Sequence, residues 1–175
     1  KYTPLRTPPG HLYTEGATLG VLQASRTMPQ AKLARHGLRK KADALIEEQG
    51  VYDVVLLDQD GMVTEGSRTN LLFFKDDEIF TAPDEYVLPG ITRQMVLMLL
   101  QQMGRPVKQA ALPLDALGPM QAACVLGTSP KVLPVRQIGS NYMFCPNFPL
   151  LQKLMQAYEL LMQQNREAWQ ATLHT

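Results

Sequence analysis

Several stretches of the chain repeat apolar residues at the spacing of an amphipathic helix. Residues 35–49 place apolar side chains on one face and charges on the other, and Gly50 follows where a left-handed residue commonly closes a helix. Residues 90–102 carry a wider apolar stripe that ends before Gly104. A further stripe after Pro149 predicts a C-terminal helix.

The other apolar segments are shorter and predict strands. Residues 51–57 are almost continuously apolar, which is typical of a strand buried on both faces. The predicted strands cover residues 18–26, 51–57, 62–65, 70–75, 78–81, 107–112, 122–126 and 131–138, with a short helix at 114–117. Strands outnumber helices and adjacent strands pair locally. The predicted fold class is therefore α+β with a mixed, barrel-like sheet and flanking helices.

The composition narrows the classes of function. At 175 residues, 45% hydrophobic and 19% charged, the chain can fill a core. A net charge of +1 provides no basic field for nucleic acid, and the basic cluster of Arg35, Arg39, Lys40 and Lys41 is interpreted as a solvated helix face. No apolar run approaches the ~18 residues that a membrane helix needs. We expect a cytoplasmic protein without nucleic-acid or membrane partners.

The cysteines and histidines give no sign of a metal or disulfide framework. Cys124 lies in an apolar run and is predicted to be a buried thiol. The histidines lack ligand spacing with cysteines or carboxylates, so no metal site is predicted. The turn-rich beginning suggests that residues 1–25 are a linker from another domain plus the first strand, ahead of one large domain over residues 26–175.

Four short motifs carry the candidate chemistry. Lys32 supplies an amine, and Glu65 supplies a carboxylate at the end of a predicted strand. The others are Gly90-Ile91-Thr92, which opens a predicted helix, and Gly127-Thr128-Ser129, which follows a predicted buried strand. A helix start presents unpaired N–H groups and the positive end of its dipole, which suits a phosphate.

The order and spacing of these motifs resembles the class IV aminotransferases, the pyridoxal-phosphate enzymes that include branched-chain and D-amino acid aminotransferases. The likeness runs over about residues 26–137. It implies the large domain of the D-amino acid aminotransferase-like fold. Members of that family carry a smaller N-terminal domain ahead of this point, so we expect the chain to be a fragment.

The resemblance also implies a role for each motif residue. Lys32 would be the catalytic lysine that binds pyridoxal 5'-phosphate through its amine; Lys40 and Lys41 compete for this role but fall within the predicted helix. Glu65 would accept a hydrogen bond from the pyridine nitrogen, and Asn70 would brace the turn after it. The remaining residues implied are Gly90, Ile91, Thr92, Gly127 and Thr128 for the cofactor phosphate, with Thr128 and Ser129 also for the substrate carboxylate.

The function that the resemblance implies is transfer of an amino group between an amino acid, of branched-chain or D-amino acid type, and a 2-oxo acid. A homodimer is expected, as in relatives. Two alternatives stay open. One is a lyase acting on aminodeoxychorismate within the same fold, and the other is a truncated, non-catalytic domain of this fold.

Overall fold

The computed structural model describes residues 7–24 and 32–173, and the side chains of residues 32–36, 171 and 173 lie outside that description. The helices are α1 (Leu12–Glu15), α2 (Lys32–Gln49), α3 (Ile91–Gln102) and α4 (Pro149–Leu173), with short 3-10 helices η1 (Asp84–Tyr86) and η2 (Leu114–Leu117). The strands are β1 (Ala17–Gln23), β2 (Asp53–Leu57), β3 (Met62–Gly66), β4 (Asn70–Lys75), β5 (Glu78–Thr81), β6 (Val107–Gln109), β7 (Leu112–Pro113), β8 (Ala122–Gly127), β9 (Lys131–Ile138) and β10 (Tyr142–Met143).

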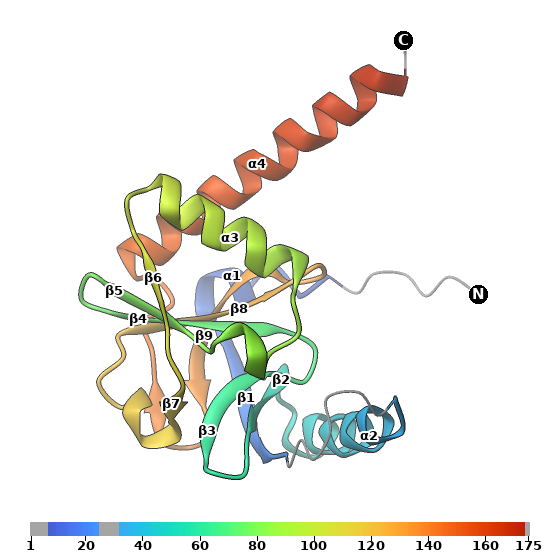
Figure 1. The fold of residues 1–175 in the computed structure, drawn as a ribbon, viewed down its shortest axis with the longest axis vertical. Coiled ribbons are helices and arrows are strands. Elements are labelled where there is room, and N and C mark those ends of the chain that lie inside the picture. Colours follow the sequence, from blue (N-terminus) through green and yellow to red (C-terminus); the bar gives the residue numbers. More distant parts are fainter. Residues whose placement is uncertain (1–6, 25–31, 174–175) are drawn as a thin grey trace.

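The strands form one mixed, curled sheet (Figure 1). Their order is β6-β5-β4-β8-β9-β1-β2-β3-β7, with β10 paired to β9. β1 runs parallel to both β2 and β9, whereas the hairpins β2–β3, β4–β5 and β8–β9 are antiparallel. The α+β class and the mixed sheet predicted from the sequence are confirmed.

The prediction of a single strand over residues 107–112 is wrong. The structure divides this segment into β6, which pairs with β5, and β7, which pairs with β3. These two strands lie at opposite ends of the strand order, so the chain crosses from one edge of the sheet to the other between them. Only residues 110 and 111 separate the two strands, so the curl of the sheet must bring its two edges close together here.

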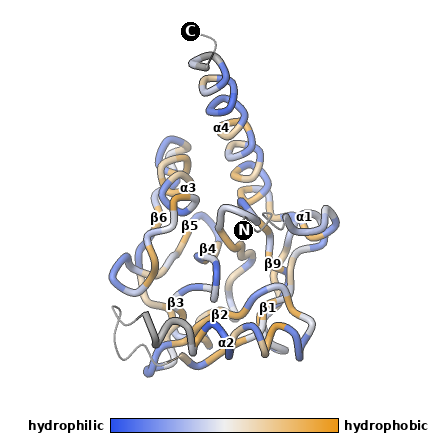
Figure 2. Tube along the Cα trace, turned by 90° about the vertical axis from the view of Figure 1, so that its right-hand side faces the viewer, coloured by the Kyte–Doolittle hydropathy of each residue, from blue (hydrophilic) through white to orange (hydrophobic). Residues whose placement is uncertain are grey.

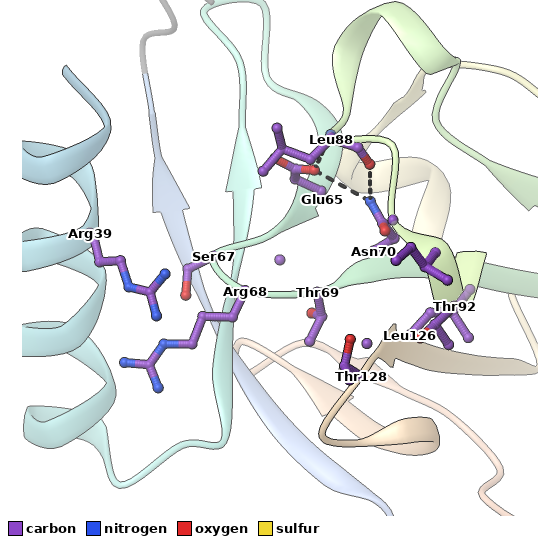
Figure 3. A pocket seen from close by; sticks show the side chains of 14 residues that line it. Arg39, Glu65, Ser67, Arg68, Thr69, Asn70, Leu88, Thr92, Leu126 and Thr128 are labelled. Carbon is purple, nitrogen blue, oxygen red and sulfur yellow. Dashed lines mark hydrogen bonds between the residues drawn. The ribbon is translucent and has the colours of Figure 1, made fainter. Parts of the chain in front are cut away.

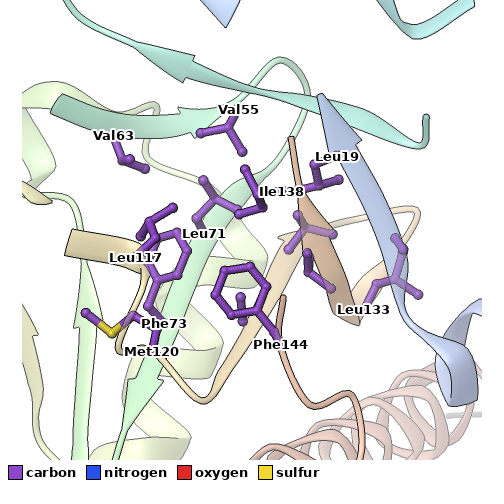
Figure 4. Close-up of a cluster of buried hydrophobic side chains, with 14 of the residues drawn as sticks. Leu19, Val55, Val63, Leu71, Phe73, Leu117, Met120, Leu133, Ile138 and Phe144 are labelled. Atoms are coloured by element: carbon purple, nitrogen blue, oxygen red, sulfur yellow. The ribbon is translucent and has the colours of Figure 1, made fainter. Parts of the chain in front are cut away.

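The curl of the sheet encloses the first of the hydrophobic clusters (Figure 4). Alternation along β4 sends Leu71 and Phe73 into this cluster and Leu72 and Phe74 to the opposite face. Phe73 also packs against Phe144, with ring centroids 6.3 Å apart. The remaining members include Leu19, Val55, Val63, Leu117, Met120, Leu133 and Ile138.

Helices α3 and α4 cover the other face of the sheet (Figure 1). From α3, Val96 and Leu100 are fully buried, and from α4 so are Leu151 and Leu154. The far part of α4 runs beyond the sheet (Figure 2), and Trp169 on it is 66% exposed. No described helix is long and apolar enough to cross a membrane.

Helix α2 packs on a smaller cluster beside β1 and β2. Of its described side chains, Ala42 belongs to the buried core of that cluster, and Leu38, Leu45 and Ile46 are partly buried against it. The helix ends where expected, since Gly50 has a φ of +62°. It begins at Lys32, three residues earlier than residue 35, where the apolar stripe placed the start.

Candidate active site

Glu65 sits at the end of β3 with its carboxylate buried and held in place (Figure 3). The side chain is 3% exposed. Its Oε2 accepts a hydrogen bond from the backbone N–H of Leu88 at 2.7 Å and a longer one from Nδ2 of Asn70 at 3.4 Å. A buried carboxylate that is fixed from one side presents a well-oriented acceptor.

Asn70 begins β4 and links Glu65 to the segment that leads into α3. Its Nδ2 also donates to the carbonyl of Leu88 at 3.1 Å. A Cβ on Gly90 would lie 2.2 Å from Oδ1 of Asn70, a separation that no real contact tolerates. The sequence predicted that Asn70 braces the turn after Glu65; the structure instead has it hydrogen-bond the Glu65 carboxylate and the entry to α3.

The start of α3 offers unpaired backbone donors. Gly90 is its N-cap residue, in extended conformation, and no described side chain caps the helix there. Thr92 is buried, and Ile91 is exposed. Because the first amides of a helix lack intrahelical partners and carry the positive end of its dipole, this terminus suits an anion.

The turn between β8 and β9 approaches the same place. Gly127 pairs with Lys131 across the turn, and Lys131 has a φ of +56°, which is uncommon for a residue other than glycine. The Tyr13 hydroxyl donates to the carbonyl of Pro130 at 3.1 Å. Lys131 also pairs with Glu159 of α4, with Nζ to Oε1 at 2.6 Å. These contacts fix the turn that carries Thr128.

A cavity of about 340 Å³ joins these elements (Figure 3). Its lining consists of Arg39, Glu65, Gly66, Ser67, Arg68, Thr69, Asn70, Leu88, Gly90, Ile91, Thr92, Leu126, Gly127 and Thr128. The structure thus brings together the predicted residues from three of the four motifs. Ser129 lies in the same turn as Thr128 but is not part of this lining.

Asp53 does not line the cavity itself, but it holds the loop that does. Its position in the sequence did not predict this role. It is 1% exposed at the start of β2. Its carboxylate accepts hydrogen bonds from the hydroxyls of Ser67 at 2.6 Å and Thr69 at 2.8 Å, and from the Ser67 amide at 3.2 Å. A Cβ on Gly66 would lie 2.7 Å from Oδ2 of Asp53, so a glycine is needed there. Burial, followed by the Asp53 charge, raises the pKa of Tyr52 to about 12.

Arg39 and Arg68 also line the cavity. Arg39 lies on an exposed helix face, as predicted, but its place beside the cavity was not predicted. Its side chain is exposed to solvent, yet it faces the cavity beside Arg68 (Figure 3). Arg68 forms an ion pair with Asp43, one helical turn along α2 from Arg39. The sequence around an exposed helical arginine does not show whether its side chain faces open solvent or a cavity.

Lys32 is placed by its backbone as the first residue of α2, and its side chain is outside the described part of the chain. Arg39 follows on the same helix, about two turns later, and reaches the cavity. Helix α2 therefore runs alongside the cavity. Lys40 and Lys41 are not part of the cavity lining.

Other candidate groups lie away from the cavity. Cys124 is fully buried, as predicted, and burial raises the pKa of its thiol. Within the described ranges, no three His, Cys, Asp or Glu side chains come together as a metal site would require.

Comparison with known proteins identifies the relatives of this chain. The sequence model of the class IV aminotransferases (Amino-transferase class IV) matches residues 3–138. A probable branched-chain-amino-acid aminotransferase of Rickettsia bellii is 31% identical over 119 residues, which covers 66% of this chain and 40% of that protein. The branched-chain-amino-acid aminotransferase of Salmonella typhimurium is 32% identical over 90 residues, covering 51% of this chain and 29% of that protein.

Solved structures agree with the sequence relatives. The branched-chain amino acid aminotransferase of T.th. with pyridoxamine 5'-phosphate superposes with a TM-score of 0.76 at 25% identity, over 85% of this chain and 52% of that one. The same enzyme complexed with N-(5'-phosphopyridoxyl)-L-glutamate gives a TM-score of 0.75 at 26% identity, over 83% and 51%. The chain therefore spans about half, or less, of the length of these relatives.

Proposed function

This chain belongs to the class IV aminotransferase family, and from that membership we propose that it acts in pyridoxal-phosphate-dependent transfer of an amino group between an amino acid and a 2-oxo acid. The observation that carries the proposal is the cavity. A buried, oriented carboxylate and a helix start without a described side-chain cap face the same space. That combination matches the two ends of a phosphorylated pyridine, whose ring nitrogen needs an anion and whose phosphate needs donors.

The residues present fit the cofactor in size and chemistry. The cavity volume of about 340 Å³ lies at the lower end of the roughly 300–1,000 Å³ usual for small-molecule sites. The Ile91 and Thr92 amides and the Thr92 and Thr128 hydroxyls would hold the phosphate. When bound, the cofactor supplies an electron sink that stabilises negative charge at the substrate Cα.

Glu65 would keep the ring nitrogen protonated. The Leu88 amide fixes Oε2 from one side, and Asn70 adds a second donor on the same oxygen. These contacts stop the carboxylate from turning away, so its charge stays directed at the cavity. A protonated ring withdraws electrons more strongly than a neutral one, and Glu65 therefore sets the strength of the electron sink.

Lys32 would attach the cofactor through its amine and carry the proton that leaves Cα. This chemistry requires the amine to be uncharged for part of each turnover. The same amine would then act as general base and general acid in the two directions of proton transfer.

We further infer a homodimer that works in the cytoplasm on branched-chain or D-amino acids. The named relatives are branched-chain enzymes, which supports that substrate class. Cys124 and Cys145 are both free, in keeping with a reducing compartment. Analytical ultracentrifugation checks the dimer, since a monomer over a wide concentration range contradicts it.

The direct test is to add cofactor to the purified protein, follow its absorbance, and assay amino transfer from leucine, D-alanine and glutamate to 2-oxo acids. We expect a spectral change on binding and a half-reaction with one of these donors. Turnover of aminodeoxychorismate without any 2-oxo acid would instead identify the lyase. Cofactor binding without either reaction would favour a non-catalytic domain of this fold.

A further inference from the structure

A buried arginine lies in the first turn of α3. Arg93 is the third residue of that helix, and its side chain is 3% exposed. Its Nη2 donates to the carbonyl of Ala82 at 2.9 Å, and its Nη1 forms an ion pair with the carboxylate of Asp84. Arg93 is not part of the cavity lining. Any effect of Arg93 on the site must therefore pass through the residues that it holds.

This position is unfavourable for a cation. Burial removes water from the guanidinium, and the first turn of a helix carries the positive end of the dipole. Asp84 offsets only part of this cost, because its side chain is 70% exposed. The Nε of Arg93 is buried and has no hydrogen-bond partner among the described residues. A methionine could fill the same space without a desolvation cost, so the stability of the fold alone does not account for an arginine here.

The contacts of Arg93 close the segment 82–90 into a loop. This segment starts at Ala82, passes through η1, and ends at Gly90, the N-cap residue of α3. Because Arg93 lies just after this end, its contacts with Ala82 and Asp84 join the two ends of the segment. A contact that holds two ends together leaves fewer conformations to the residues between them.

The closed segment supports both ends of the proposed cofactor site (Figure 3). The Leu88 amide donates to Oε2 of Glu65, and the Leu88 carbonyl accepts from Asn70. At Gly90 the segment meets α3, where the unpaired amides of the helix begin. A displacement of the segment would therefore move the support of Glu65 and the phosphate donors together.

We propose that Arg93 is a positioning residue, which holds the segment 82–90 closed and so sets the place of Glu65 and of the start of α3 for the cofactor. This inference rests on the proposed function. The planar guanidinium suits the task, because it donates in fixed directions to a carbonyl and to a carboxylate at once. An ammonium keeps the charge but lacks this fixed geometry.

The first measurement uses the protein without cofactor and follows hydrogen exchange of the Leu88 amide, which its bond to Glu65 protects. The proteins are the unaltered chain, Arg93→Met, Arg93→Lys and Leu100→Ala. Arg93→Met leaves no buried charge behind, since Asp84 is exposed. Leu100→Ala is the matched control, because it also removes a fully buried side chain from α3 but lies outside the closed segment and the cavity lining.

We expect Arg93→Met to speed exchange at Leu88 by about tenfold or more, the scale of a lost charge-assisted hydrogen bond. Arg93→Lys should give a smaller increase. Leu100→Ala should leave the rate within about threefold, because the Leu88 amide exchanges by local opening. Unchanged exchange in Arg93→Met overturns the inference. So does an equal increase in Leu100→Ala, which would show that the rate reports unfolding of the whole protein.

The second measurement is the affinity for pyridoxal 5'-phosphate, followed by absorbance in the same four proteins. Arg93→Met should weaken binding by about tenfold to a hundredfold, Arg93→Lys by less, and Leu100→Ala by no more than about threefold. If Arg93→Lys restores the full affinity while exchange at Leu88 stays as fast as in Arg93→Met, Arg93 acts through its charge alone, and the positioning role is wrong.

The two hypotheses can fail separately. If the unaltered protein binds no cofactor, the proposed function fails, and exchange at Leu88 still shows whether Arg93 holds the segment. If cofactor binds the unaltered protein and Arg93→Met equally well, the proposed function stands and the positioning role of Arg93 is wrong.

Discussion

Helices α2 and α3 both border the candidate site, yet they are attached to the sheet in different ways. Along α3, Val96 and Leu100 are fully buried against the second core cluster. Helix α2 is longer, with 18 residues against 12, yet Ala42 alone is fully buried among its described side chains. The α3 side of the cavity is therefore built into the core, and the α2 side rests on a small apolar cluster and the Arg68–Asp43 ion pair.

The difference separates two tasks of the site. The α3 side holds fixed groups, since Glu65, Asn70 and Leu88 are joined by hydrogen bonds to one another. Such an arrangement suits a cofactor that stays bound through the reaction. The α2 side carries Lys32, whose amine is proposed both to attach the cofactor and to carry the substrate proton, and Arg39, which lines the cavity. Substitutions on the two sides should therefore have different effects.

The largest effect should come from Glu65→Gln on the α3 side. The amide keeps the size of the side chain and can still accept from the Leu88 N–H, but it loses the charge. We expect transamination to fall on the order of a thousandfold, the scale of removing one preorganised electrostatic group, while cofactor still binds. Glu78→Gln is the control, because Glu78 is an exposed carboxylate on β5 paired with Lys108. Near-normal turnover in Glu65→Gln would leave Glu65 a purely structural residue.

The same truncation in each helix measures how strongly each is attached. Leu100→Ala removes a fully buried side chain from α3 and should lower the free energy of unfolding by about 2–5 kcal/mol. Leu45→Ala removes a partly buried one from α2 and should lower it by about 1 kcal/mol. Chemical denaturation gives both values, and equal losses would contradict the contrast between the helices.

Asp53 joins the two sides, because the loop that it holds carries Arg68, which reaches α2. Asp53→Asn should destabilise the protein by about 1–3 kcal/mol, since the amide replaces one of the two acceptor oxygens with a donor, and either Ser67 or Thr69 then loses its hydrogen-bond acceptor. Denaturation measures the cost, with the solvent-exposed Asp60→Asn as control. A loss no larger than that of the control would show that the buried carboxylate does not organise the loop.

The smallest expected effects come from alanine substitutions at two glycines, one on each side of the site. Gly90→Ala would drive a Cβ to 2.2 Å from Oδ1 of Asn70, and should cost about 1–3 kcal/mol and weaken cofactor binding. Gly37→Ala in α2 meets nothing within 4 Å and should stabilise the protein by roughly 0.5–1 kcal/mol through better helix propensity. Thermal melts measure both changes in stability, and changes of the same sign would contradict the expected difference between Gly90 and Gly37.

The sequence predicted the fold where local patterns decide the structure. The buried run that became β2 and the stripes that became α3 and α4 depend on periodicity within one element. The segment 107–112 was wrongly predicted because its division into β6 and β7 depends on partners at the two opposite ends of the strand order, which the curl of the sheet brings together. No property of those residues alone specifies that crossing.

The site was predictable to the extent that its residues stand in short motifs. Glu65, Thr92 and Thr128 were identified in this way and converge on the cavity. Asp53 was missed because an acidic residue at the start of an apolar run gives no periodic signal. Arg39 is exposed, as predicted, but its place on the cavity lining was not predicted, because a cavity beside an exposed helix face forms only when loops from elsewhere in the chain fold against it.

The central claim is that Lys32 and the cavity hold the cofactor together, and one measurement tests it directly. The protein is loaded with pyridoxal 5'-phosphate, treated with borohydride, digested, and the modified lysine is located by mass spectrometry. We predict the label on Lys32, with Lys32→Ala unlabelled and still folded. Label on Lys40 or Lys41, or unchanged labelling of the Lys32→Ala protein, would contradict the account.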